Sequence, residues 1–221
     1  MDYKLIEYLK NFVTEKRYNL FLDKIKYRTD YLTVVLEDIY QPHNASAVLR
    51  TCDCFGIQDV HIIENRNKYK VNPDVALGSF KWLNLIKHNS YDNNTISTIK
   101  DLKKQGYRIV ATTPHTNDVL LNDFDLNKGK TALFFGTELQ GLSKEMMNNA
   151  DEFLRIPMYG FTESFNISVS AALVLHYLSE KLRKSDIAWQ LSNDKKNKVL
   201  INWLKNTIKN SDIIEKQFYK K

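Results

Sequence analysis

Apolar positions in the first thirty residues follow a helical spacing. Leu5, Tyr8, Leu9 and Phe12 recur at i, i+3, i+4 and i+7, and a second set with the same spacing starts at Tyr18. A stripe of this kind is typical of an amphipathic helix. The pattern therefore predicts two amphipathic helices, or one helix with a break.

From residue 31 onward the pattern changes to short apolar runs separated by helical stretches. We expect strands at residues 32–39, 59–64, 107–113, 131–138 and 152–158, with a further candidate at 83–89. We expect helices at residues 44–56, 93–105, 143–149 and 166–183. Strands that alternate with helices indicate an α/β fold with a mostly parallel sheet that is covered on both faces.

The chain turns polar after residue 184 and then shows one more helical stripe. The apolar side of this stripe is formed by Leu200, Trp203, Leu204, Thr207 and Ile208, among many basic residues. A single apolar face needs a partner. We therefore expect this terminal helix to pack on a neighbouring element or on a second subunit.

The basic excess of the chain lies at its two ends. The net charge is +6, to which residues 1–30 contribute +2 and residues 181–221 contribute +7, whereas residues 31–180 carry −3. Basic ends on a near-neutral middle favour a polyanionic partner, most simply a nucleic acid; charge kept for solubility is the alternative. We divide the chain into an N-terminal helical extension (1–30), a central domain (31–183) and a basic C-terminal helical extension (184–221).

Several classes of protein are disfavoured. No apolar run approaches the roughly 18 residues of a membrane span, and the opening "MDYKLIEYLK" is acidic and amphipathic, unlike a signal peptide. Cys52 and Cys54 stand two apart, which suits neither a zinc site nor a redox C-x-x-C pair. We expect a cytoplasmic protein with structural thiols, no metal and no membrane partner.

Prolines and a glycine mark where the expected strands end. Pro42, Pro114, Pro157 and Gly136 each follow an apolar run, and proline cannot continue a central ladder. Ligands of open α/β sheets bind outside the carboxyl ends of the strands. The segment "GTELQGLS" has the glycine spacing of a P-loop, but Leu142 replaces the lysine. A small cofactor held by backbone groups therefore fits better than nucleotide hydrolysis.

The helix expected after Pro42 carries two polar residues with two interpretations. In the structural one, Asn44 or Ser46 caps the helix and Arg50 pairs with Asp53 three residues later. In the functional one, Asn44 and Arg50 face the crevice at the strand ends, where the guanidinium fork suits phosphate oxygens. The spacing alone leaves both open.

Three segments carry a family resemblance. They are "QPHNASAVLRTCDCFG" (motif 1), "FFGTELQGLS" (motif 2) and "IPMYGFTESFNISVSAALVL" (motif 3), in this order. Together they resemble the SPOUT superfamily of knotted methyltransferases and, within it, the TrmH branch of 2′-O-ribose methyltransferases. The resemblance implies a parallel sheet with a C-terminal deep trefoil knot, whose loops bind S-adenosylmethionine, and a homodimer that completes the site.

The resemblance also implies roles for individual residues. The catalytic arginine and its companion asparagine match Arg50 and Asn44, and the family's Ser-Leu-Asn matches Ser164, Phe165 and Asn166, with phenylalanine for leucine. Glu138, from the family's Gly-x-Glu, completes the catalytic set together with Ser164. The implied cofactor contacts are Thr112, Thr113, Phe135, Gly136, Glu138, Ile156, Met158, Ser164 and Phe165.

The implied activity is 2′-O-methylation of tRNA, most simply at guanosine 18 of the D-loop. Ribosomal RNA relatives often carry a larger N-terminal RNA-binding domain, for which thirty residues are too few. The alternatives are ribosomal RNA or another tRNA position, and a non-catalytic RNA-binding protein of the same fold. The family proposal implies that Arg50 is the general base. A guanidinium normally stays protonated, so we favour stabilisation of the developing alkoxide by Arg50, oriented by Asn44, or activation of the arginine only while it contacts the substrate phosphate.

Overall fold

The computed structural model describes residues 2–69, 72–76, 78–114, 119–138 and 140–220. By their internal contacts the residues divide into two compact units. The sheet unit runs from Asp30 to Trp189, and the terminal unit combines the chain up to Thr29 with the chain from Gln190 onward. Each unit is described by itself below.

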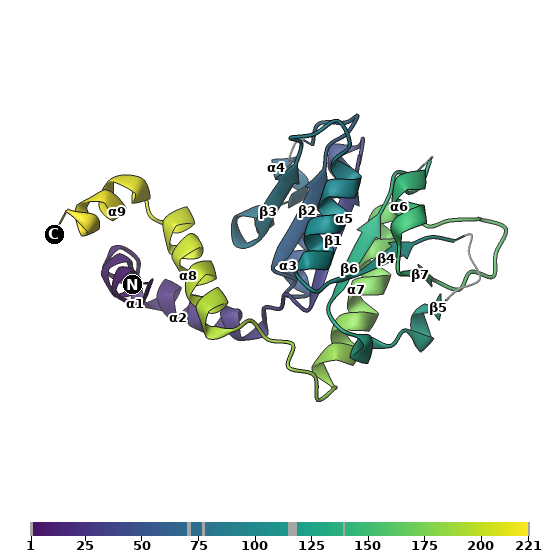
Figure 1. Cartoon of the computed structure of the whole chain (residues 1–221). Helices are drawn as coiled ribbons and strands as arrows, with labels where there is room; N and C mark the ends of the chain where they lie inside the picture. Colours follow the sequence, from purple (N-terminus) through teal and green to yellow (C-terminus); the bar gives the residue numbers. More distant parts are fainter. Residues whose placement is uncertain (1, 70–71, 77, 115–118, 139, 221) are drawn as a thin grey trace. The chain divides into compact units, whose positions relative to one another are not determined.

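The sheet unit is built on seven strands that pair in the order β3-β2-β1-β6-β4-β7-β5 (Figure 1). Every described pairing is parallel, which confirms the expected parallel α/β sheet. The strands are β1 (Leu32–Glu37), β2 (Asp59–Ile63), β3 (Asn84–His88), β4 (Arg108–Thr112), β5 (Val119–Leu120), β6 (Thr131–Phe135) and β7 (Glu152–Arg155).

Helices cover both faces of this sheet (Figure 1). One core joins α3 and α7 to alternate strand residues such as Val34 and Leu133, and the other joins α5 and α6 to the opposite set, such as Val35 and Phe134. The α-helices of the unit are α3 (Pro42–Cys54), α4 (Pro73–Ala76), α5 (Asn94–Lys104), α6 (Lys144–Asn149) and α7 (Ile167–Arg183). Its 3-10 helices are η3 (Ser79–Trp82), η4 (Leu121–Asp123) and η5 (Leu126–Lys128).

The central strands read as continuous apolar runs because they are buried on both sides. Every residue of β1 and of β6 is buried, as is typical of a parallel sheet between two helical layers. The edge strand β3 is the candidate strand at 83–89; three of its residues are partly buried and two are exposed. The expected strands end one to three residues earlier than predicted, because their last residues leave the ladder to form loops.

The structure differs from the expected elements at the start of α3 and at strand β5, among others. Helix α3 begins at Pro42, whose missing N–H suits the first helical position, and its N-cap Gln41 makes no side-chain capping bond. Asn44 and Ser46 therefore do not cap this helix; they lie within its first turns. Strand β5 was not predicted, since two residues carry no periodic signal.

The terminal unit is made of helices from both ends of the chain. Leu5, Ile6 and Leu9 of α1 are buried, α8 packs on α1 and α2, and the rings of Phe21 and Trp203 lie 5.6 Å apart. The expected apolar stripe near the C-terminus thus packs on the N-terminal helices. The elements are α1 (Asp2–Leu9), η1 (Lys10–Phe12), α2 (Glu15–Lys24), η2 (Ile25–Tyr27), α8 (Asn193–Thr207) and α9 (Ser211–Tyr219).

The charge is divided unevenly between the two units. The terminal unit holds 15 Lys and Arg against 7 Asp and Glu, a net charge of +8, whereas the sheet unit holds 17 against 19, a net charge of −2. Within the described part of the chain, the search for a helix both long and apolar enough to span a bilayer finds none.

Candidate active site

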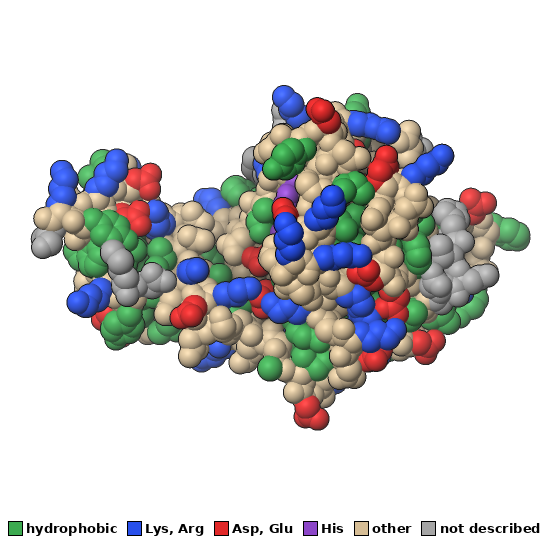
Figure 2. Space-filling view, in the orientation of Figure 1, with side chains coloured by type: hydrophobic (Ala, Val, Ile, Leu, Met, Phe, Trp, Pro, Cys, Tyr) green, Lys and Arg blue, Asp and Glu red, His purple; other side chains and the backbone are tan. Residues whose placement is uncertain are grey.

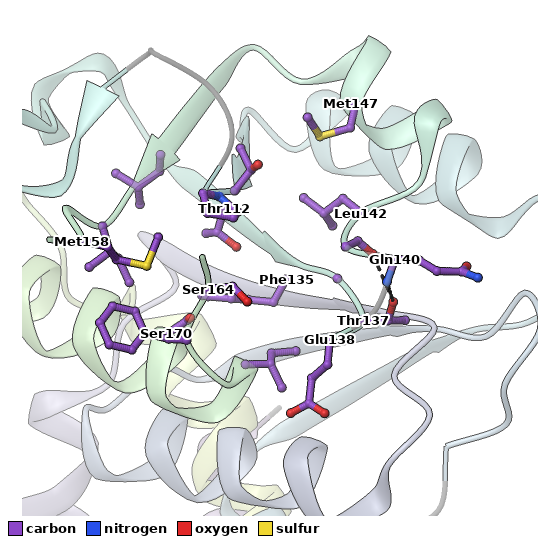
Figure 3. Close-up of a pocket in the computed structure, with 18 residues that line it drawn as sticks. Thr112, Phe135, Thr137, Glu138, Gln140, Leu142, Met147, Met158, Ser164 and Ser170 are labelled. Carbon is purple, nitrogen blue, oxygen red and sulfur yellow. Dashed lines mark hydrogen bonds between the residues drawn. The ribbon is translucent and has the colours of Figure 1, made fainter. Parts of the chain in front are cut away.

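A cavity of about 310 Å³ opens where β4, β6 and β7 end. Met158, Ser164 and Ser170 lie on one side of it, and Gln140 and Leu142 lie on the other (Figure 3). The residues predicted to contact a cofactor all line this cavity; they are Thr112, Thr113, Phe135, Gly136, Glu138, Ile156, Met158, Ser164 and Phe165. The fold thus gathers three loops that are far apart in the sequence, at the carboxyl ends of the strands where ligands of such sheets bind.

One wall of the cavity is formed by residues 136–138 and 140–142, here called the motif-2 loop, which fold tightly against one another. Thr137 and Gly141 exchange two backbone hydrogen bonds, of 2.9 and 3.0 Å, and Gly141 has a φ of 65°. A Cβ on Gly136 would lie 2.2 Å from the carbonyl carbon and oxygen of Gly141. Position 136 therefore requires glycine, because any side chain would push the two sides of the loop apart.

Glu138 gathers the asparagines of motifs 1 and 3. Nδ2 of Asn44 donates to Oε1 of Glu138 at 2.9 Å, Nδ2 of Asn166 donates to the same oxygen, and Nδ2 of Asn166 also donates to Oδ1 of Asn44 at 3.2 Å. A further bond from Nδ2 of Asn44 to Oε1 of Gln41, at 3.0 Å, holds the first turn of α3. The carboxylate of Glu138 thus joins two other residues predicted to be catalytic, so three of the five lie in one cluster.

Asn166 has a second role as the N-cap of α7. Its Oδ1 accepts from the backbone N–H of Ser168 at 2.8 Å and from the hydroxyl of Ser168 at 2.6 Å. An N-cap side chain satisfies one of the unpaired amides of the first turn. Oδ1 of Asn166 therefore caps α7, while its Nδ2 bonds to the cluster around Glu138. One side chain thus fixes the helix and the cluster together.

Arg50 lies apart from this cluster within one chain. It is exposed near the end of α3, is not among the cavity-lining residues, and has no hydrogen bond or ion pair with another described residue. Asn44 is bonded to Glu138 and its neighbours instead of to Arg50. Ser164 lines the cavity and is itself exposed. The structure thus gathers four of the five predicted catalytic residues and leaves the guanidinium facing solvent.

Some residues of the cavity wall were not predicted. Gln140 and Leu142 lie within motif 2, so the motif was already the signal for them. Met147 comes from α6, and only the packing of that helix shows which of its residues faces the cavity. No group of three or more His, Cys, Asp or Glu side chains among the described residues is placed to hold a metal ion.

Two histidines are paired away from the cavity, on β2 and on the neighbouring edge strand β3. Nδ1 of His61 and Nε2 of His88 lie 2.9 Å apart, and the two rings stack. Burial, and then the neighbouring His88, lower the pKa of His61 to about 4. Burial also lowers the pKa of His88, against an opposing effect of Asp101. Both rings are therefore held neutral as one part of the sheet's packing.

The sequence matches one family model and a set of curated relatives. The model of the SpoU rRNA Methylase family matches residues 31–176. A protein of Borreliella burgdorferi named tRNA (guanosine(18)-2′-O)-methyltransferase is 44% identical over 212 residues, which cover 96% of this chain and 95% of that protein.

Solved structures agree with this match. The A. aeolicus TrmH/SpoU tRNA modifying enzyme is 31% identical, has a TM-score of 0.76, and covers 88% of this chain and 98% of its own. The fold is also that of the SpoU methyltransferase AviRb from Streptomyces viridochromogenes, crystallised with AdoMet, at 22% identity and a TM-score of 0.59 over 74% of this chain and 62% of that one. Sequence, fold and the meeting of motifs 2 and 3 at one cavity, with Asn44 of motif 1 bonded to its wall, lead to the same conclusion: the chain belongs to the SpoU methylase family.

Proposed function

We propose that this protein transfers a methyl group from S-adenosylmethionine to the 2′-hydroxyl of a tRNA nucleotide, guanosine 18. The observation that carries the proposal is the cavity at the ends of β4, β6 and β7, with the cluster of Asn44, Glu138 and Asn166 beside it. The name of the 44% identical relative supports the nucleotide.

The cavity suits S-adenosylmethionine in size and chemistry. Its volume of about 310 Å³ lies in the range of small-ligand sites, and it combines the apolar side chains of Phe135, Ile156 and Met158 with hydroxyl groups such as that of Ser164. The backbone groups of the motif-2 loop would hold the polar parts of the ligand. When bound, S-adenosylmethionine supplies an activated methyl group on a sulfonium.

The residues around the cavity would then align and activate the ribose. Nδ2 groups of Asn44 and Asn166 occupy Oε1 of Glu138, and no described residue bonds to its Oε2, which is left as an acceptor for a ribose hydroxyl. Alignment of the reacting atoms supplies a large part of the rate. Arg50 would stabilise the negative charge that develops on the attacking oxygen, since its guanidinium stays protonated.

We propose a homodimer in which the partner subunit completes this site. Arg50 is outside the cavity of its own chain, so a second copy is the simplest source of the missing cation. Val169 and Leu173 of α7, four residues apart, are 44% and 39% exposed beside the cavity, and Phe165 is 41% exposed. An apolar strip of this kind next to a site fits a contact between subunits.

The remaining parts of the proposal concern the chain path and the RNA. We place the knotted domain at residues 31–183, where β6 inserts between β1 and β4 in the sheet. The extensions 1–30 and 184–221 would bind tRNA in the cytoplasm, because the terminal unit carries the basic excess. On the face in Figure 2, Lys and Arg side chains of the sheet unit lie among Asp and Glu side chains instead of forming one basic area.

The test is incubation of the full chain with labelled S-adenosylmethionine and an unmodified tRNA transcript, followed by mapping of the methylated nucleotide. We expect one 2′-O-methylated guanosine in the D-loop, and no label after Asn44→Ala. Label in ribosomal RNA and none in tRNA would refute the proposed substrate. A methylated tRNA nucleotide outside the D-loop would refute the proposed position.

A further inference from the structure

We propose that Glu37, a buried residue that does not line the cavity, is a positioning residue that sets the affinity for the cofactor by holding the motif-2 loop. The inference rests on the proposed function, since it names the ligand of that cavity as S-adenosylmethionine. Glu37 is the last residue of β1 and is 3% exposed.

The carboxylate of Glu37 is bound to the residue that follows the motif-2 loop. Oε2 accepts from the backbone N–H of Ser143 at 2.8 Å, and Oε1 accepts from the hydroxyl of Ser143 at 2.7 Å. The same hydroxyl accepts from the N–H of Met146 at 3.1 Å and so caps α6. Glu37 therefore fixes both the end of the loop and the start of the helix that supplies Met147 to the cavity wall.

A third hydrogen bond joins Glu37 to helix α5. The hydroxyl of Thr95 in α5 donates to Oε1 at 2.6 Å, and accepts from Nδ2 of Asn65 at 2.9 Å. Among the described residues no Lys or Arg pairs with Glu37, so neutral donors alone satisfy it. Burying a carboxylate costs free energy. A buried carboxylate such as that of Glu37 is therefore a candidate for holding its neighbours in one conformation.

Asp38, the residue after Glu37, supports the motif-2 loop through a second set of hydrogen bonds. Oδ1 of Asp38 accepts from the backbone N–H groups of Asn65, Arg66 and Asn67, at 2.8, 2.8 and 3.3 Å. Arg66, placed in this way, donates from Nη1 to Oε1 of Gln140 at 3.1 Å, and Gln140 lines the cavity. Glu37 thus binds the residue after the motif-2 loop directly, and Asp38 reaches Gln140 of the loop through Arg66.

This arrangement has a direct consequence for the site. The motif-2 loop contacts the motif-1 helix through Glu138 and Asn44, and it is held from the opposite side by Glu37, only five residues before that helix begins. Moving Ser143 would move the adjacent Leu142 of the cavity wall, whereas Glu37 itself has no hydrogen bond to Asn44 or Arg50. Loss of the Glu37 contacts should therefore weaken the binding of the cofactor more than the binding of the RNA.

The test compares Glu37→Gln with Glu152→Gln in the full chain. Glu152 is also largely buried, but it pairs with Arg108 and Lys128 at the amino ends of the strands, away from the cavity. Isothermal titration without RNA gives the Kd for S-adenosylmethionine, and steady-state assays separate its KM from that of tRNA. We expect Glu37→Gln to raise the cofactor Kd about tenfold, as off-site changes in coupled networks do, with the tRNA KM within about twofold.

The outcomes separate the two proposals. Glu152→Gln should lower the Tm and leave the cofactor Kd unchanged; an equal Kd in the two variants would refute the positioning role of Glu37. A wild-type chain that binds no S-adenosylmethionine would refute the proposed function and the inference with it. Should Glu37→Gln not fold, Ser143→Ala is expected to raise the Kd and Ser143→Thr, which keeps the hydroxyl, to restore it; an unchanged Kd in Ser143→Ala would refute the inference.

Discussion

Asn166 and Asn44, which are 122 residues apart in the chain, are hydrogen-bonded side chain to side chain at 3.2 Å. Both also donate to one oxygen of Glu138. The contact joins the start of α7 to the first turn of α3 beside the cavity. Because Asn166 uses its oxygen for the helix and its nitrogen for the cluster, the two roles can be separated by substitution.

Asn166→Asp should keep the cap of α7 and lose the activity. Aspartate still caps α7, but it cannot donate to Glu138 and places a second carboxylate beside it. We expect methyl transfer to fall on the order of tenfold or more, the scale of a lost charge-assisted hydrogen bond. Asn166→Ala should lose the same activity and, in addition, about 1 kcal/mol of stability from the missing cap. Thermal unfolding and a methylation assay check both; equal Tm losses in the two variants would contradict the division of roles.

Arg50→Lys should retain measurable activity, whereas Arg50→Ala should lose most of it. The residue is exposed and unpaired among the described residues, so both changes should leave the stability within about 0.5 kcal/mol. The measurements are kcat and the Kd values for tRNA and S-adenosylmethionine. Complete loss of activity in Arg50→Lys, with normal binding of both ligands, would rule out a role of charge alone.

Gly136→Ala should abolish cofactor binding, because its Cβ would lie 2.2 Å from the carbonyl of Gly141. The two sides of the motif-2 loop must then separate. Gly160→Ala is the matched control, since a Cβ there meets nothing within 4 Å and no positive φ is involved. Calorimetric titration with S-adenosylmethionine distinguishes them. Normal binding by the Gly136 variant would show that the loop can open without loss of the site.

The stability of the sheet unit should fall as the pH falls from about 6.5 towards 4. The folded chain holds His61 neutral down to a pKa of about 4, whereas the unfolded chain takes up the proton near pH 6.5. The unfolded state binds more protons in this window, which costs up to about 3 kcal/mol. Urea unfolding at several pH values should show a weaker dependence for His61→Leu. Exposed His43 provides the control, and a His61→Leu slope equal to that of His43→Gln would contradict the prediction.

Periodicity and strand-end signals predicted the sheet, its main helices and the place of the cavity, because these follow from local patterns. The residues of the cavity wall were predicted from the family resemblance. Their side-chain types gave no signal, because the backbone path of the loops is what brings them together. The start of α3 could have been read from Pro42, a residue that suits the first turn.

Other features depend on tertiary contacts alone. The partners of Glu37 come from α5 and from the loop before α6, so no spacing along the chain indicates them. The packing of α8 on α1 could not be predicted either, because an apolar stripe does not indicate which element it packs on. For Arg50 the sequence says more than the structure of one chain. The motif indicates a catalytic role, but the position of Arg50 outside the cavity is compatible with that role only if a second subunit is present.

The contact between Phe21 and Trp203 bears on how this chain is made. The N-terminal helices leave the ribosome first, but their buried partners in α8 follow about 180 residues later, on the order of ten seconds or more at ordinary rates of synthesis. During that interval the apolar side chains of Leu5, Ile6 and Leu9 have no native cover. The terminal unit therefore cannot complete its packing until α8 has been synthesised.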